Sequence, residues 1–215
     1  MKRRPPISFR TRSLSAFSLI ELLVVVALMG ILTALLFPAF NRIGKAGLLG
    51  AEGNTLVNLI NFAGQNAMSK NALTALIAVA PDPARPNDYR GFALFEYLSG
   101  AQSWKQVSRW EVLKQGVVVD PGSLTFSDYP AARPVPDFPA IQYKGTPISS
   151  FKYIHFLPTR GLYTGEAASI RLAEGYFADS GPVPIYTGGK TGSEPSNFYR
   201  ITVIGPTGRP KIDRP

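Results

Sequence analysis

AFSLIELL, residues 16–23, stands where a basic N-terminal segment meets a long apolar run. Residues 1–16 carry five basic side chains and no acidic one, and Glu21 is the only charged side chain in residues 17–41. About 20 helical residues cross the hydrocarbon core of a bilayer, which is about 30 Å thick. The run is long enough for this, so we predict a transmembrane helix over residues 17–40. The alternative is a helix buried in a soluble core, and a fully apolar circumference beside a basic flank argues against it.

The charge that flanks this run predicts its orientation. Basic residues precede it, and the positive-inside rule places such a segment in the cytoplasm. We therefore expect a single-pass protein of the inner (cytoplasmic) membrane, with a cytoplasmic N-terminus and a periplasmic or extracellular C-terminal domain. The basic segment also supplies much of the formal net charge of +9, since residues 17–215 carry 18 basic and 14 acidic side chains. Because the excess of basic residues outside this segment is small, the charge gives only weak support to a nucleic-acid-binding function.

Residue usage narrows the possible chemistry. The chain has no cysteine, which excludes disulfides and thiolate metal sites, and its single histidine, His155, excludes a multi-histidine metal site. The sequence has no cluster of acid–base residues, so we expect neither an enzyme nor a bound metal or cofactor. His155 lies in the alternating stretch KYIHFL at 152–157 and is predicted to be a half-buried or surface strand residue, not a catalytic one.

The remainder predicts one long helix followed by β-structure. Apolar residues at three- and four-residue spacings predict a helix from 17 to about 71, which Pro38 is expected to kink. The fold class is therefore α+β, with a long N-terminal helix followed by an antiparallel β-sheet domain at 72–215. Residues 121–147 contain six prolines and are predicted to form a long surface loop, because central strands exclude proline. The predicted strands are 72–80, 90–98, 103–113, 117–119, 151–157, 168–173, 198–204 and 209–212.

Residues 12–45 resemble the N-terminal segment of type IV pilins and of type II secretion pseudopilins. The stretch FSLIELLVV at 17–25 matches that family almost residue by residue, and Gly30 and Pro38 fall where the family often has a helix glycine and a kinking proline. The resemblance implies a pilin-like fold. It also implies a function in protein secretion or filament assembly, as a minor pilin or pseudopilin subunit of a type II secretion pseudopilus or a type IV pilus-like filament.

The same resemblance implies a processing site at the end of the basic leader 1–16. A prepilin peptidase, which is also an N-methyltransferase, is expected to cut between Ala16 and Phe17 and then to methylate the new amino group of Phe17. The family has glycine before the cut, so Ala16 is a departure that puts the efficiency of cleavage in doubt. The implied partners are this peptidase, other pilin or pseudopilin subunits, and inner-membrane lipid.

Glu21 has two interpretations. Locally, Ser18 and Glu21 have the S-x-x-E spacing of a capping box at a helix start. In an assembly, Glu21 would neutralise the Phe17 ammonium of a neighbouring subunit inside a helical bundle. An unpaired buried charge is costly, so such a pair disfavours wrong registers even if it contributes little net stability. We predict that Glu21 is an assembly residue.

The C-terminal half carries weaker hints. FLPTRG at 156–161 and ITVIGPTGR at 201–209 resemble H-type minor pseudopilins, and the chain is also similar to pilin-like cassette proteins of the Verrucomicrobia. Arg209 and Lys211 offer a nucleic-acid contact, although a solvated chain end is the favoured interpretation. GGKT at 188–191 lacks the spacing of a phosphate-binding loop and is expected to be a polar turn. The alternative to the whole assignment is an unprocessed, signal-anchored periplasmic binding or interaction domain.

Overall fold

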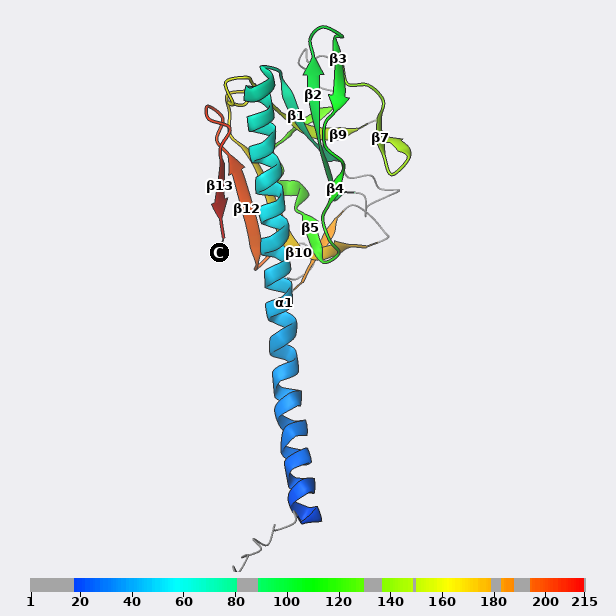
Figure 1. Cartoon of the computed structure of the whole chain (residues 1–215), viewed down its shortest axis with the longest axis vertical. Helices are drawn as coiled ribbons and strands as arrows, with labels where there is room; N and C mark the ends of the chain where they lie inside the picture. Colours follow the sequence, from blue (N-terminus) through cyan, green and yellow to red (C-terminus); the bar gives the residue numbers. More distant parts are fainter. Residues whose placement is uncertain are drawn as a thin grey trace, which may run out of the picture. The chain divides into compact units, whose positions relative to one another are not determined.

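The computed structural model of the chain describes residues 18–80, 89–129, 137–148, 150–178, 183–187 and 194–214, with backbone alone for 35–46 (Figure 1). These residues form one long helix and two main antiparallel sheets, so the predicted α+β class, a helix followed by antiparallel sheets, is confirmed. The chain divides into two compact units, Met1–Ile43 and Gly44–Pro215, and the helix contributes residues to both.

The helix α1 spans Leu19–Lys70. It ends where Asn71 takes the left-handed conformation, with φ at 49°, which asparagine tolerates better than most residues. The backbone N–H groups of Asn71 and Ala72 donate to the carbonyls of Met68 and Ala67, at 3.4 and 3.2 Å. These bonds satisfy carbonyls of the last turn, so the helix has a capped C-terminal end.

A six-stranded antiparallel sheet forms around β1. Its strand order is β3-β2-β1-β9-β6, and β4 also pairs with β2. In the centre, Leu76 of β1 lies opposite Leu94 of β2 and Ile154 of β9. The strands are β1 (Thr74–Val79), β2 (Gly91–Leu98), β3 (Ser103–Gln106), β4 (Glu111–Val112), β6 (Ser127–Tyr129) and β9 (Phe151–Phe156).

A second antiparallel sheet has the order β11-β10-β12-β13, and β5 also pairs with β10. Ile201 of β12 lies between Ile170 of β10 and Ile212 of β13. Residues 141–148 add a two-stranded hairpin, and a 3₁₀ turn, η2 (Pro121–Ser123), follows β5. The strands are β5 (Val117–Val119), β10 (Ala168–Phe177), β11 (Pro184–Tyr186), β12 (Phe198–Val203), β13 (Pro210–Asp213), and in the hairpin β7 (Ile141–Tyr143) and β8 (Thr146–Ile148).

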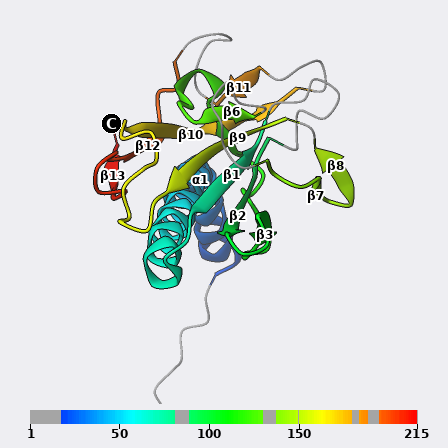
Figure 2. The ribbon, with the colours of Figure 1, turned by 90° about the horizontal axis from the view of Figure 1, so that it is seen from above.

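The main hydrophobic core lies between α1 and the two sheets, which Figure 2 shows on one side of the helix. Apolar side chains of α1 at three- and four-residue spacings form one stripe, as the sequence pattern indicates. The stripe consists of Leu49, Leu56, Leu59, Ile60, Ala63 and Ala67, all buried. It packs against both sheets, from β1, β2 and β9 to β10 and β12.

A second, mainly aromatic core covers the outer face of the six-stranded sheet. Alternate residues of β9 point to it: Phe151, Tyr153 and His155, whereas Ile154 and Phe156 face the main core. Phe138 packs among these rings, against Phe151 at 5.2 Å between ring centroids. The centre of the six-stranded sheet is therefore buried on both faces, which explains why β1 has no exposed residue.

The prediction of a surface loop at 121–147 is wrong for its described residues. These contain η2, β6, β7 and the start of β8, and Ile141 and Tyr143 are almost fully buried. Proline did not prevent this, since Pro121 opens the 3₁₀ turn and Pro147 lies in a two-stranded hairpin, where a missing donor costs little. The predicted strand 103–113 is also interrupted, because β3 ends at Gln106 and β4 begins at Glu111.

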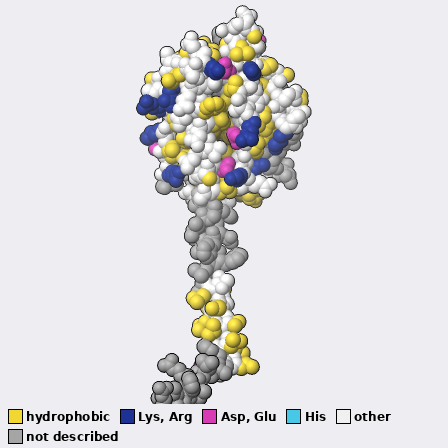
Figure 3. All heavy atoms as spheres, in the orientation of Figure 1, with side chains coloured by type: hydrophobic (Ala, Val, Ile, Leu, Met, Phe, Trp, Pro, Cys, Tyr) yellow, Lys and Arg dark blue, Asp and Glu magenta, His cyan; other side chains and the backbone are white. Residues whose placement is uncertain are grey.

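Within Met1–Ile43, the described side chains of α1 are exposed. Figure 3 shows hydrophobic side chains along this part of the helix, with exposed fractions between 44% for Val25 and 82% for Leu19. Among the described residues, no helix has the length and hydropathy expected of a membrane span. The predicted span, 17–40, lies partly outside the described side chains, which stop at residue 34 and resume at 47.

Candidate functional site

The start of α1 holds the residues that the sequence singles out. The backbone N–H of Ser18 donates to Glu21 Oε2 at 2.9 Å, and the backbone N–H of Glu21 donates to Ser18 Oγ at 3.2 Å. This reciprocal capping box satisfies two N–H groups that a helix start leaves unpaired. The local interpretation of Glu21 is thus present in the geometry, and its assembly role stays a prediction. Ala16 and Phe17 lie outside the described residues, as does the side chain of Pro38, so cleavage and the helix kink also stay predictions.

In the second unit, α1 has an exposed face without charge. Between residues 47 and 69 the only charged side chain is Glu52, which is buried. Solvated helix faces normally carry Lys and Glu, and the centre of this face is instead Phe62, with 47% of its surface exposed. Such a face suits burial against another protein. Its members are Ala51, Asn54, Thr55, Asn58, Phe62, Gln65, Met68 and Ser69.

Polar side chains of α1 also fix the helix to the sheets, among them Asn54 at the edge of the exposed face. Glu52 Oε2 accepts a hydrogen bond from the backbone N–H of Lys114 at 3.3 Å. Glu52 Oε1 also forms an ion pair with the side-chain Nζ of Lys114 at 3.5 Å. Three amides add further hydrogen bonds: Tyr199 Oη to Asn54 Oδ1 at 2.8 Å, Arg160 Nη2 to Asn61 Oδ1 at 2.9 Å, and Asn66 Nδ2 to Thr74 Oγ1 and Glu96 Oε2, both at 3.1 Å. These bonds set the rotation and register of the helix on the sheets, which an apolar stripe alone defines loosely.

The structure brings the two C-terminal motifs together. The backbone N–H of Leu162, next to the FLPTRG motif, donates to the carbonyl of Gly205 at 2.6 Å. Gly208 has φ at 58°, and a Cβ there would overlap the carbonyl oxygen of Arg160. The side chain of Arg160 in turn reaches Asn61 of α1. The β12–β13 turn, the end of β9 and the helix therefore form one connected joint, in which glycine at 208 is required by both conformation and space.

His155 is buried, with 5% of its surface exposed, so the prediction of a half-buried or surface histidine is wrong. Its ring stacks on Trp104 at a centroid distance of 5.2 Å and an interplanar angle of 10°, and it also contacts Phe138 and Tyr153. Burial lowers the pKa of His155 from 6.5 to about 4. The imidazole is therefore neutral at pH 7 and acts as part of the aromatic core. The sequence pattern missed this because the covering layer comes from distant residues.

A buried ion pair joins the end of β5 to β10. Arg171 Nε donates to Asp120 Oδ2 at 2.7 Å, Arg171 Nη2 contacts the same oxygen, and Asp120 Oδ1 accepts the backbone N–H of Gly122 at 3.1 Å. Burial lowers the pKa of Arg171, but the hydrogen bond and charge of Asp120 outweigh this and leave the pKa raised. Burial, with the hydrogen bond to Asp120, raises the pKa of Tyr186. No local motif marks this pair, whose partners are far apart in the sequence.

The terminal β13 carries the two residues considered for nucleic-acid contact. Lys211 Nζ lies 3.3 Å from Asp213 Oδ1, so its charge is partly balanced within the strand. Arg209 is exposed in the turn before β13. A contact with DNA stays a prediction. The GGKT stretch lies outside the described residues.

Comparisons with known proteins bear on the N-terminal segment first. Residues 12–37 match the family model described as the prokaryotic N-terminal methylation motif. The predicted resemblance to type IV pilins and pseudopilins is therefore confirmed in the segment that carries it. None of the curated proteins compared matches the chain.

Two solved structures overlap most of the chain at low scores. The minor pseudopilin EpsH from the type 2 secretion system of Vibrio cholerae has a TM-score of 0.43 and 11% identity, and the overlap covers 78% of this chain and 97% of that one. The type IV minor pilin FimU of Pseudomonas aeruginosa has a TM-score of 0.42 and 11% identity, covering 78% and 92%. Because both TM-scores are below 0.5, these two likenesses carry no argument, and the resemblance depends on the methylation motif at 12–37.

Proposed function

We propose that the chain is a minor pilin or pseudopilin subunit, a structural component and not an enzyme. A prepilin peptidase cuts between Ala16 and Phe17 and methylates the new amino group of Phe17. The apolar part of α1 holds the subunit in the inner membrane until it enters a filament. The β-rich domain then lies on the periplasmic or outer side. The observation that carries this proposal is the methylation motif at 12–37.

Two features of α1 support an assembly role. Its first part exposes large apolar side chains that require either lipid or other helices as cover. Its second part exposes the uncharged face around Phe62, which suits packing against a neighbouring subunit. A head-to-tail, heterologous contact between such surfaces generates an open helical filament. The system served, a secretion pseudopilus or a type IV pilus-like filament, is set by partners outside this chain.

Mass spectrometry of the mature N-terminus tests the proposal. We expect a chain that begins with N-methylated Phe17 in cells that contain the peptidase, and a chain that keeps residues 1–16 in cells without it. An intact leader in both strains would support the alternative, an unprocessed signal-anchored domain. Ala16→Gly is the matched variant, and it should raise the processed fraction if alanine slows the cut.

Substitutions at Glu21 test the assembly role separately from helix capping. Glutamine at this position also completes a capping box, so Glu21→Gln keeps the cap and removes the charge. Glu21→Ala removes both. We expect both variants to insert in the membrane and both to lose co-purification with the assembled subunits. Normal incorporation of Glu21→Gln would show that the charge has no assembly role.

A further inference from the structure

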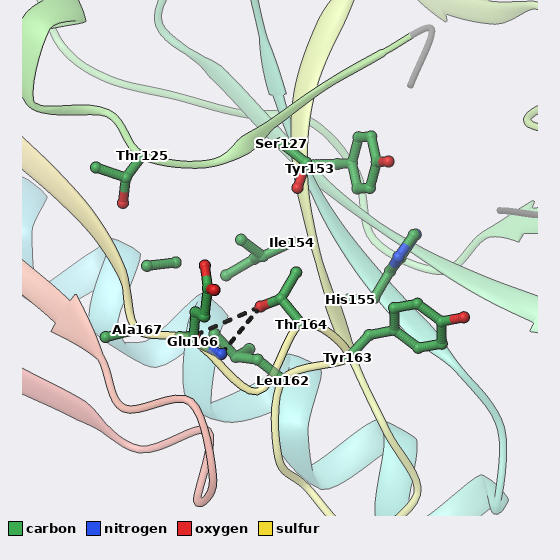
Figure 4. A pocket seen from close by; sticks show the side chains of 11 residues that line it. Thr125, Ser127, Tyr153, Ile154, His155, Leu162, Tyr163, Thr164, Glu166 and Ala167 are labelled. Atoms are coloured by element: carbon green, nitrogen blue, oxygen red, sulfur yellow. Dashed lines mark hydrogen bonds between the residues drawn. The ribbon is translucent and has the colours of Figure 1, made fainter. Parts of the chain in front are cut away.

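A small cavity opens where the six-stranded sheet meets the start of β10 (Figure 4). Its volume is about 100 Å³, room for several water molecules or one slender side chain. Its floor is apolar and consists of the buried side chains of Ile154, Leu162 and Ala168. The cavity therefore has one wall from β9 and another from the connection that leads into β10.

The rim of this cavity is rich in hydrogen-bond acceptors. Figure 4 shows the Glu166 carboxylate and the hydroxyl groups of Ser127 and Thr164 around Ile154. Thr164 Oγ1 accepts the backbone N–H of Glu166 at 3.3 Å. Thr125 Oγ1, also on the rim, accepts the backbone N–H of Ser169 at 2.7 Å. Each hydroxyl oxygen has two lone pairs and keeps one for a further donor.

The electrostatic character of the cavity is negative. Glu166 is the only charged residue among those that line it, and its carboxylate makes no ion pair with any residue that the structure describes. The rim residues Tyr163 to Ala167 are all exposed, so a group from another molecule can reach it. The chemistry that fits is a cation with several donors on an apolar stem.

A lysine side chain has this chemistry. Its ammonium has three donors and no acceptor, and its four methylenes pack on apolar surface while the charge stays at the rim. The flat arginine fork needs a wider, planar set of acceptors. We propose that the cavity accepts a lysine side chain from an adjacent subunit, with the stem on Ile154 and Leu162 and the ammonium at Glu166. The choice of a subunit as the source rests on the proposed function.

Binding of a lysine probe to the single chain tests the chemistry without any assembly. The full chain in detergent micelles is titrated with Nα-acetyl-lysine methylamide, and methyl NMR signals of Ile154, Leu162 and Ala168 are followed. We expect saturable shifts at these methyls. The norleucine analogue, which lacks the ammonium, should bind about tenfold more weakly, and Glu166→Gln should remove that difference.

Three results would overturn the lysine assignment: no localised shift, equal binding of the norleucine probe, or tighter binding of the corresponding arginine derivative, Nα-acetyl-arginine methylamide. Saturation by free putrescine at concentrations well below those needed for the lysine probe would assign the cavity to a free amine and overturn the subunit source.

Incorporation in cells tests the source of the lysine. We expect Glu166→Lys to reduce co-purification with the other subunits several-fold, because it places a cation where the lysine binds. Asp137→Lys, at another exposed acid of the same domain, is the matched control and should incorporate normally. If Glu21 variants fail to incorporate while Glu166→Lys incorporates fully, the lysine contact is wrong and the subunit function stands. If Phe17 is never processed, the function fails, and the probe titration still decides the cavity.

Discussion

The buried pair Asp120–Arg171 gives the sharpest prediction of stability. Asp120 and Arg171 are 6% and 7% exposed, so Asp120→Ala leaves a guanidinium charge in the interior whose one remaining ion pair, within the described part of the chain, is with Glu194 at 3.5 Å. Removing one partner of a buried pair costs about 3–5 kcal/mol. For a domain of this size, about 2–4 °C of Tm is lost per kcal/mol, so we expect a fall of roughly 6–20 °C.

Thermal unfolding of the chain in detergent micelles, followed by near-UV circular dichroism, measures this fall. The matched control is Asp128→Ala. Asp128 pairs with Lys152 at 2.7 Å, but its own side chain is 75% exposed, and such pairs contribute about 0–1 kcal/mol. We therefore expect Asp128→Ala to shift Tm by no more than a few degrees.

A double replacement separates the uncompensated charge from simple loss of packing. Asp120→Leu with Arg171→Met removes both charges and keeps apolar volume, so it should recover most of the stability lost in Asp120→Ala. The part not recovered belongs to the two other hydrogen bonds of Asp120, with the Gly122 N–H and with Tyr186, about 1 kcal/mol each. The argument is refuted if Asp120→Ala costs no more than Asp128→Ala, or if the double variant is as unstable as the single one.

Three further predictions follow from the geometry. Because burial lowers the pKa of His155 from 6.5 to about 4, the unfolded chain binds a proton first, and stability falls as pH drops through that range and levels off below it; between pH 7 and pH 4 the wild type should lose about 3 kcal/mol more free energy of unfolding, measured by urea titration, than His155→Phe. Gly208→Ala should cost at least about 3 kcal/mol, because its Cβ overlaps the Arg160 carbonyl, whereas Gly145→Ala, at φ 76° with open space, should cost about 1 kcal/mol; equal losses would contradict the overlap. DNA contact at β13 requires that Arg209→Ala with Lys211→Ala weakens binding at low salt and flattens its salt dependence, and unchanged binding removes that hypothesis.

Hydrophobic periodicity predicted which face is buried in those elements that pack against a single continuous core. The apolar stripe of α1 and the alternation in β12 indicate directly which face is buried, since each faces one continuous core. In β2 and β9 both faces are largely buried, against two different cores, so the sequence pattern marks these strands without marking a single buried face. The prediction of a surface loop at 121–147 was wrong for the opposite reason. Their strands are three residues long and their burial depends on rings from β3 and β9, so no local pattern marks them. His155 was misjudged through the same missing layer, because Phe138 and Trp104 cover it from other parts of the chain.

The polar anchors of α1 were also beyond prediction. Nothing in the sequence distinguishes Asn54, Asn61 and Asn66 from Asn58, another asparagine of the same helix. Their partners lie on β1, β2, β12 and the turn after β9, and only the packed fold decides which amide meets a partner. The motif at 12–37 differs, because a peptidase acts on the chain as a linear sequence and the signal is therefore local.

The geometry at Glu21 makes its two interpretations compatible with each other. The capping bond uses Oε2, and a carboxylate has about four acceptor sites, so Glu21 can close the helix start and still accept an ammonium. The cap also holds the side chain next to the backbone of Ser18, one residue from the position where cleavage would create the new amino group. A carboxylate fixed there has less side-chain entropy to lose when a neighbouring subunit brings its own ammonium to it. If Glu21 has the proposed assembly role, capping therefore prepares that contact and does not compete with it.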